Sequence, residues 1–369
     1  MKSAASHRIM ELDGLRAFAV GVVVLYHMSQ YSGSLPKGPS YLFEVVTSLG
    51  FHGVAIFFII SGFIITRLLM REREKAGQVS LTGFYIRRFF RIVPPFAAYL
   101  LVILALRAIG SVLISNRHVF WSMLFLQDFR PYDWHGWLIG HTWSLSVEEQ
   151  FYLIFPPALC WLGFRSRVTG VALSACFAIC AISPQLADRV LPFIRSAWAA
   201  IECLYNFRYI IIGVIIALYD RHILRLLGNK SRLLPALLAA VAISMDSVRP
   251  SNHYLGAAMA ALEPCICGLF VMWFVANPAR CGFLRQPAVQ WLGACSYSIY
   301  LWQQLFTGPA SSYRGWTPSS APLCLMATLL CAAISHYLIE RPAIRLGRLF
   351  SAPGFIAKPV GSGDALEAI

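Results

Sequence analysis

The stretch ELDGLRAFAVGVVVLYHM, residues 11–28, decides the class of this protein. Between Arg16 and His27 nearly every residue is apolar, and on a helix this segment rises by about 16 Å, roughly half of a bilayer's hydrocarbon thickness. Arg16 is therefore expected at one membrane face and His27 well inside the hydrocarbon. Because an ionisable side chain at that depth is costly, it marks a candidate functional site. The stretch predicts a transmembrane helix that carries a candidate catalytic histidine.

The composition also indicates a membrane protein. Of the 369 residues, 58% are hydrophobic and 13% are charged, whereas soluble domains have about 25% charged residues. The mean hydropathy is +0.63, and long apolar runs recur along the chain. We therefore expect an all-α, polytopic membrane helical bundle surrounded by lipid. The ten cysteines lie mostly in apolar runs without CxxC or Cys/His spacing, which predicts neither a disulfide framework nor a metal site.

Hydropathy predicts about ten transmembrane helices and one shorter apolar segment. Residues 119–129 form the shorter segment, which is expected to be re-entrant or interfacial because it is too short to cross comfortably. The ten spans are expected at 15–33, 49–69, 92–110, 143–163, 170–187, 205–220, 233–248, 255–276, 288–307 and 321–339.

The basic residues indicate an orientation. A net charge of +14 would suggest nucleic-acid binding in a soluble protein. In this chain most Lys and Arg residues fall in alternate loops, so the positive-inside rule places these loops and both termini in the cytoplasm, and no nucleic-acid partner is expected. The membrane domain is expected over residues 8–348. Residues 349–369, rich in Ala, Gly and Pro, are expected to form a disordered cytoplasmic tail.

A cluster of arginines lies at the start of the third predicted span. The sequence FYIRRFFRIVPPF, residues 84–96, contains Arg88 and Arg91, which are three residues apart and so share a helix face. Guanidinium groups bind phosphate bidentately, and such a cluster favours a phosphorylated cytoplasmic ligand. Plain anchoring at the membrane face is the alternative. For Arg16 and His27 the alternative is a snorkelling arginine and a histidine hydrogen-bonded to a neighbouring helix.

Two adjacent carboxylates occur early in the fourth predicted span, in HTWSLSVEEQFYLIFP, residues 141–156. Glu148 follows Ser144 by four residues and Trp143 by five, so it shares part of their helix face. A buried carboxylate could orient the imidazole of His27 or tune its basicity. A structural polar lock between helices is the alternative.

Three weaker features accompany these motifs. Ser61 and Gly62 lie inside the second span, where small residues allow helices to approach closely. Glu263 is a further intramembrane acid, for which helix packing and a place on a substrate path both remain open. His52 and His141 lie near the outer ends of spans, where an interfacial role and an acceptor entrance are the two interpretations.

With these motifs the chain resembles the acyltransferase family 3 membrane proteins, the group of O-antigen and exopolysaccharide acetylases. The resemblance rests on ELDGLRAFAVGVVVLYH, GVAIFFIISGF, YIRRFFRIVPP, HTWSLSVEEQFYL, CSYSIYLW and IERP, which follow the family's order over nearly the whole chain. One departure is Gln303, because many members carry a histidine at that position. This departure argues against a role for a ninth-span histidine here.

The resemblance implies transfer of an acyl group, usually acetyl, from cytoplasmic acyl-CoA to a hydroxyl of an envelope or secreted glycan. The expected location is the bacterial inner membrane, alongside polysaccharide-synthesis machinery. His27 would act as general base or form an acyl-imidazole, and Glu148 would orient it. The other expected contacts are Arg16, Arg88 and Arg91 with the CoA phosphates, and Trp143 and Ser144 with the substrate.

Two other classes of function fit a polytopic membrane protein with intramembrane acids. A transporter or flippase for a glycan precursor would be expected to show paired repeats and two discontinuous helices, which the sequence does not indicate. A non-catalytic membrane partner of a polysaccharide synthase is the second alternative.

Overall fold

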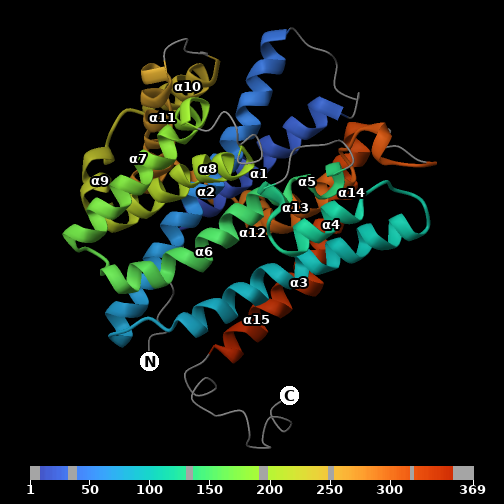
Figure 1. The fold of residues 1–369 in the computed structure, drawn as a ribbon, viewed down its shortest axis with the longest axis horizontal. Helices are drawn as coiled ribbons and strands as arrows, with labels where there is room; N and C mark the ends of the chain where they lie inside the picture. Colours follow the sequence, from blue (N-terminus) through green and yellow to red (C-terminus); the bar gives the residue numbers. More distant parts are fainter. Residues whose placement is uncertain are drawn as a thin grey trace, which may run out of the picture.

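The computed structural model describes residues 9–31, 40–129, 136–190, 198–247, 253–315 and 320–351. Within these ranges every regular element is a helix, and the only strand-like pairing is an isolated bridge between Val112 and Tyr313 (Figure 1). The all-α prediction is therefore confirmed. Of the predicted tail, residues 352–369 lie outside the described residues, while α15 continues to Phe350.

The helices follow the predicted spans in order. The α-helices are α1 (Met10–Tyr31), α2 (Ser40–Ala76), α3 (Leu81–Ala108), α4 (Asn116–Met123), α5 (Trp137–Gly140), α6 (Thr142–Leu162), α7 (Arg167–Val190), α8 (Trp198–Leu218), α9 (Asp220–Leu227), α10 (Leu234–Ser247), α11 (His253–Ala276), α12 (Pro287–Ala294), α13 (Ser296–Trp302), α14 (Ala321–Ser335) and α15 (Arg341–Phe350). Short 3-10 turns are η1 (Gln127–Phe129), η4 (Pro278–Arg280), η5 (Gly282–Arg285), η6 (Gln303–Leu305) and η7 (Ala310–Ser312), and a π-helical turn, η8 (His336–Glu340), joins α14 to α15.

Fewer helices than predicted are clear membrane spans by length and composition. In the described part of the chain five stretches meet both criteria: Met10–Ser29, Leu49–Ala76, Leu81–Ala108, Tyr254–Ala276 and Ala321–Phe350. Shorter apolar helices occur at Arg167–Ile182, Cys203–Leu218 and Leu234–Met245. These helices are consistent with a multi-pass membrane protein, but the structure supports the predicted number of ten only in part.

The ninth predicted span, 288–307, is not one continuous helix. It divides into α12, α13 and η6, with the first break at Cys295. Gly293 lies directly against the backbone carbonyl of Asp13 in α1, where a Cβ would overlap that carbonyl. Hydropathy records the apolar content of this segment but not where its helix is interrupted, so the predicted ninth span is divided into these shorter elements.

The segment 119–129 does not cross the bundle. It contains most of α4, which has eight residues, and the short turn η1. A helix of that length rises by about 12 Å, far less than a bilayer requires. The structure thus agrees with the prediction that this segment is not a transmembrane helix.

Helix α2 packs extensively against α1 and α8 in the centre of the bundle (Figure 1). Gly62 of α2 faces the carbonyl of Ile210 in α8, and Gly213 of α8 faces the carbonyl of Ile59 in α2. A Cβ at either glycine would overlap the opposing carbonyl. The close helix approach predicted from Ser61 and Gly62 is therefore confirmed.

Helices α3 and α15 lie side by side (Figure 1). The rings of Phe90 and Phe350 stack with centroids 5.5 Å apart, which fixes one face of α3 against α15. Pro94 and Pro95 lie inside α3, and the helix continues through them. Another face of α3, with Arg88, turns toward Tyr152 of α6.

Candidate active site

One cavity is lined by residues of five helices, α1, α2, α3, α6 and α13. This cavity is partly open to the outside. Five of the predicted site residues line it: Arg16 of α1, Arg88 and Arg91 of α3, and Ser144 and Glu148 of α6. Segments separated by more than a hundred residues in the sequence therefore meet at one site.

The helical register separates the neighbouring arginines of α3. Arg87 donates to Glu72 at 2.9 Å and does not line the cavity. Arg88 and Arg91 both line it, as their spacing predicted, and Arg88 lies over the ring of Tyr152 at 4.5 Å. Among the described residues, no carboxylate lies within ion-pair distance of Arg16, Arg88 or Arg91. Their donors are therefore available to an anionic ligand.

Glu148 contacts other residues than the sequence suggested. Ser61 donates to its Oε1 at 2.7 Å and Tyr152 to its Oε2 at 3.2 Å. Arg88 and Arg16 attract the carboxylate electrostatically from across the cavity. Glu148 has no hydrogen bond to His27 among the described contacts, and its role toward the imidazole stays a prediction. Its carboxylate instead lies within the field of the arginines.

His27 lies beyond the cavity rather than in its wall. Its ring is half-buried, and its Nδ1 is 2.8 Å from Oε1 of Gln303. The edge of Trp137 packs against the imidazole with ring centroids 5.3 Å apart. Gln303 is therefore the hydrogen-bond partner of His27 in the described part of the chain. Trp143 also lies outside the cavity lining and packs against Phe58, with ring centroids 6.1 Å apart.

Tyr300 of α13 connects the cavity to the region of His27. Its hydroxyl is 2.6 Å from Oγ of Ser144 and donates to the carbonyl of His141 at 2.9 Å. The ring centroids of Tyr300 and His141 lie 5.3 Å apart, and His141 contacts Gln304 while His27 contacts the adjacent Gln303. The motif CSYSIYLW contains Tyr300, but nothing in the sequence indicated that it would lie opposite Ser144.

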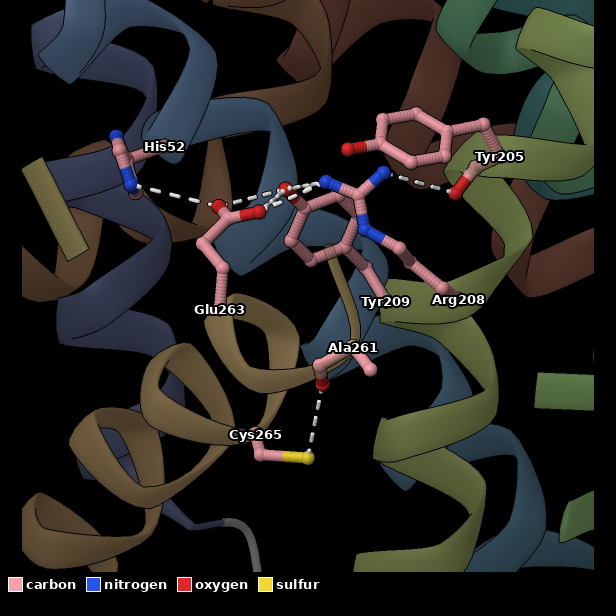
Figure 2. Close-up of polar contacts among 7 residues, drawn as sticks. All are labelled: His52, Tyr205, Arg208, Tyr209, Ala261, Glu263 and Cys265. Carbon is pink, nitrogen blue, oxygen red and sulfur yellow. Dashed lines mark hydrogen bonds and ion pairs between the residues drawn. The ribbon is translucent and has the colours of Figure 1, made fainter. Parts of the chain in front are cut away.

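A second polar cluster lies between α2, α8 and α11 (Figure 2). Arg208 donates to Oε2 of Glu263 at 2.7 Å, and the hydroxyl of Tyr209 is 2.6 Å from Oε1. His52 approaches the same carboxylate at 3.5 Å, and all four side chains are buried. Of the two interpretations of Glu263, these contacts favour helix packing.

The described residues include one group with metal-ligand chemistry. Ligand atoms of His52, Glu263 and Cys267 lie within 4.8 Å of one another. However, both oxygens of Glu263 already accept hydrogen bonds, and the guanidinium of Arg208 would repel a second cation at this carboxylate. The cluster is therefore a poor metal site.

Comparison with known proteins agrees with the motifs. A family model described as an acyltransferase domain matches residues 9–337. The peptidoglycan O-acetyltransferase OatA of Listeria monocytogenes is 26% identical over 94% of this chain, and the O-acetyltransferase OatA of Staphylococcus aureus is 26% identical over 95%. The chain spans 57% and 59% of the length of these two relatives. No solved structure matches it.

Proposed function

Because the chain belongs to the acyltransferase family 3 of membrane proteins, we propose that it transfers an acyl group, acetyl in the first instance, from acyl-CoA to a hydroxyl of a glycan. Two of its relatives are O-acetyltransferases by name, and one of them acts on peptidoglycan. The acceptor proposed here is an envelope or secreted polysaccharide, which would be supplied by polysaccharide-synthesis machinery in the same membrane. No metal is required for this transfer.

The observation that carries the proposal is the convergence of three arginines without carboxylate partners on one cavity. Arg16, Arg88 and Arg91 would bind the phosphates of CoA, because guanidinium groups match phosphate oxygens in geometry and charge. Glu148 would keep these arginines oriented through its electrostatic attraction to Arg88 and Arg16. The cavity would thus select a donor with several negative charges.

His27 would be the catalytic base. Along α1 it lies about 16 Å beyond Arg16, a separation that suits a donor whose charged head and reactive thioester are joined by a slender arm. Ser144 and Tyr300, which contact each other in the cavity wall, would guide this arm. Trp143, packed behind Phe58, would shape the wall rather than touch the substrate.

The donor-binding cavity would face the cytoplasm. We place both termini there, with ten crossings in a membrane domain over residues 8–348, as the distribution of basic residues indicates. The broken segment formed by α12 and α13 would be one of these crossings, because broken helices are tolerated where other protein segments cover them. The membrane would be the bacterial inner membrane.

Mass spectrometry of surface and secreted polysaccharide tests this function. Cells with the protein should carry glycan esters that cells without it lack, and the added mass identifies the acyl group. Labelled acyl-CoA given to membrane vesicles should supply the ester. If His27→Ala and Arg88→Ala both leave the ester content unchanged, the protein is not the acyltransferase proposed here, and a transport or scaffold role remains. Labelled acyl groups trapped on His27 with donor alone would indicate an acyl-imidazole step.

A further inference from the structure

The side chain of Gln303 is buried beside the candidate catalytic histidine, and its amide nitrogen has no hydrogen-bond partner among the described residues. Gln303 opens η6 directly after α13 and is fully buried. Its Oε1 is 2.8 Å from Nδ1 of His27, whereas its Nε2 has no hydrogen-bond partner among the described residues. Buried amide donors are nearly always paired, because an unpaired one costs free energy. An unpaired donor in this position points to a ligand group.

The contact also fixes the protonation pattern of the imidazole. An amide oxygen can only accept, so Nδ1 of His27 carries the hydrogen and Nε2 of the ring holds the free lone pair. Nε2 is then the atom that can remove a proton from an acceptor hydroxyl. The oxygen of the Gln303 amide therefore holds His27 in the tautomer that can act as a base, while its nitrogen presents an N–H donor near the same ring.

A second unpaired polar atom of complementary type lies close by. Gln304, the next residue, accepts from Nδ1 of His141 at 2.7 Å and from the backbone N–H of His141 at 3.1 Å. Nε2 of His141 is then an acceptor, and it has no partner among the described residues. Trp137 lies between the two pairs, because its ring packs against His27 and its indole N–H donates to the carbonyl of Gln304. An unpaired donor and an unpaired acceptor beside two histidines are what a polar reacting group would require.

We propose that the Nε2–H donor of Gln303 stabilises the oxyanion formed on the acyl carbonyl during transfer. This role rests on the proposed function. Nε2 of His27 takes the proton of the acceptor hydroxyl while the hydroxyl oxygen bonds to the carbonyl carbon of the thioester. The electron pair of the carbonyl double bond moves onto the carbonyl oxygen, which faces Gln303. When the tetrahedral species collapses, the C–S bond breaks and the thiolate takes the proton from the imidazolium. The products are the ester and free CoA thiol, and His27 is neutral again.

The informative variant is Gln303→Glu. It preserves an oxygen that accepts from Nδ1 of His27 but removes the N–H donor and places negative charge where the oxyanion forms. Loss of one oxyanion donor lowers kcat by about 10²- to 10³-fold. We expect this loss with the donor KM within about threefold, since the arginine cavity is untouched. Gln303→His, which restores a ring N–H, should recover most of the rate.

Gln290→Glu is a matched control. Its amide donates to the carbonyls of Met10 and Leu284 away from His27, so its transfer rate should be unchanged. If Gln303 only positions His27, Gln303→Glu will keep kcat within tenfold of the original and raise the pH at which activity begins, and the proposal is overturned. The proposed function itself fails separately, if His27→Ala leaves transfer intact. Measured CoA affinity of Gln303→Glu shows that the variant is folded, and loss of kcat with unchanged affinity supports the proposal.

Discussion

Replacing Arg88 by alanine separates a phosphate-binding arginine from one that only anchors the helix. Arg88 lines the cavity, lies over Tyr152 at 4.5 Å and has no ion-pair partner among the described residues, so its donors are free for a ligand. A hydrogen bond to a charged group contributes about 1.5–3 kcal/mol. At about 1.4 kcal/mol per factor of ten, Arg88→Ala should weaken CoA binding by about 10- to 150-fold.

The neighbouring Arg87 provides the control. It is paired with Glu72 at 2.9 Å, the pair is partly exposed, and such pairs contribute only about 0–1 kcal/mol. Arg87 also lies outside the cavity lining, so Arg87→Ala should change CoA affinity less than about fivefold, although it removes the same charge one residue away. Arg88→Lys keeps the charge but loses the fork of donors, and its affinity should fall between the two.

Isothermal titration of CoA into protein held in lipid nanodiscs measures these affinities directly. Binding to the original protein should weaken as salt is raised, and Arg88→Ala should reduce that dependence. Dephospho-CoA, which lacks one phosphate, tests whether Arg88 contacts that phosphate. If it does, the loss of affinity caused by Arg88→Ala and the loss caused by the missing phosphate will not be additive. Equal losses in Arg87→Ala and Arg88→Ala would refute the reasoning, since bulk charge would then explain the effect without a specific site.

Three other substitutions test separate parts of the structure. His27→Ala should lower acyl transfer by about 10²- to 10⁴-fold with CoA affinity unchanged, as read by glycan ester content and titration; an unchanged ester content would contradict this. Arg208→Leu leaves Glu263 buried without its cation and should lower the free energy of unfolding in detergent by about 3–5 kcal/mol. Adding Glu263→Leu should restore part of this stability, and no recovery would exclude an ion pair between the two side chains. Gly213→Leu should destabilise the α2–α8 crossing by about 1–3 kcal/mol or more, whereas Gly21→Leu, at a site with open space, should not; equal melting temperatures would count against the close crossing.

The candidate site could be predicted from the sequence only where a single helix supplied the geometry. Arg88 and Arg91 share a face because of their spacing, and both do line the cavity. Arg87 was separated from them only by the structure, which supplied Glu72 as its partner. For Glu148 the spacing predicted the face of α6 that lines the cavity, but it could not predict that Ser61 and Tyr152 donate to the carboxylate.

The sequence by itself determined the helical class, the apolar helices of a multi-pass membrane protein and the family. These follow from apolar runs and fixed residue spacings, which act along one helix and need no knowledge of its neighbours. Only the tertiary structure decided that Gln303, 276 residues away, contacts His27 and that the segment 288–307 breaks at Cys295. Contacts between helices depend on how side chains and close-packed glycines such as Gly293 fit against opposing backbones, and no periodicity along the chain records that fit.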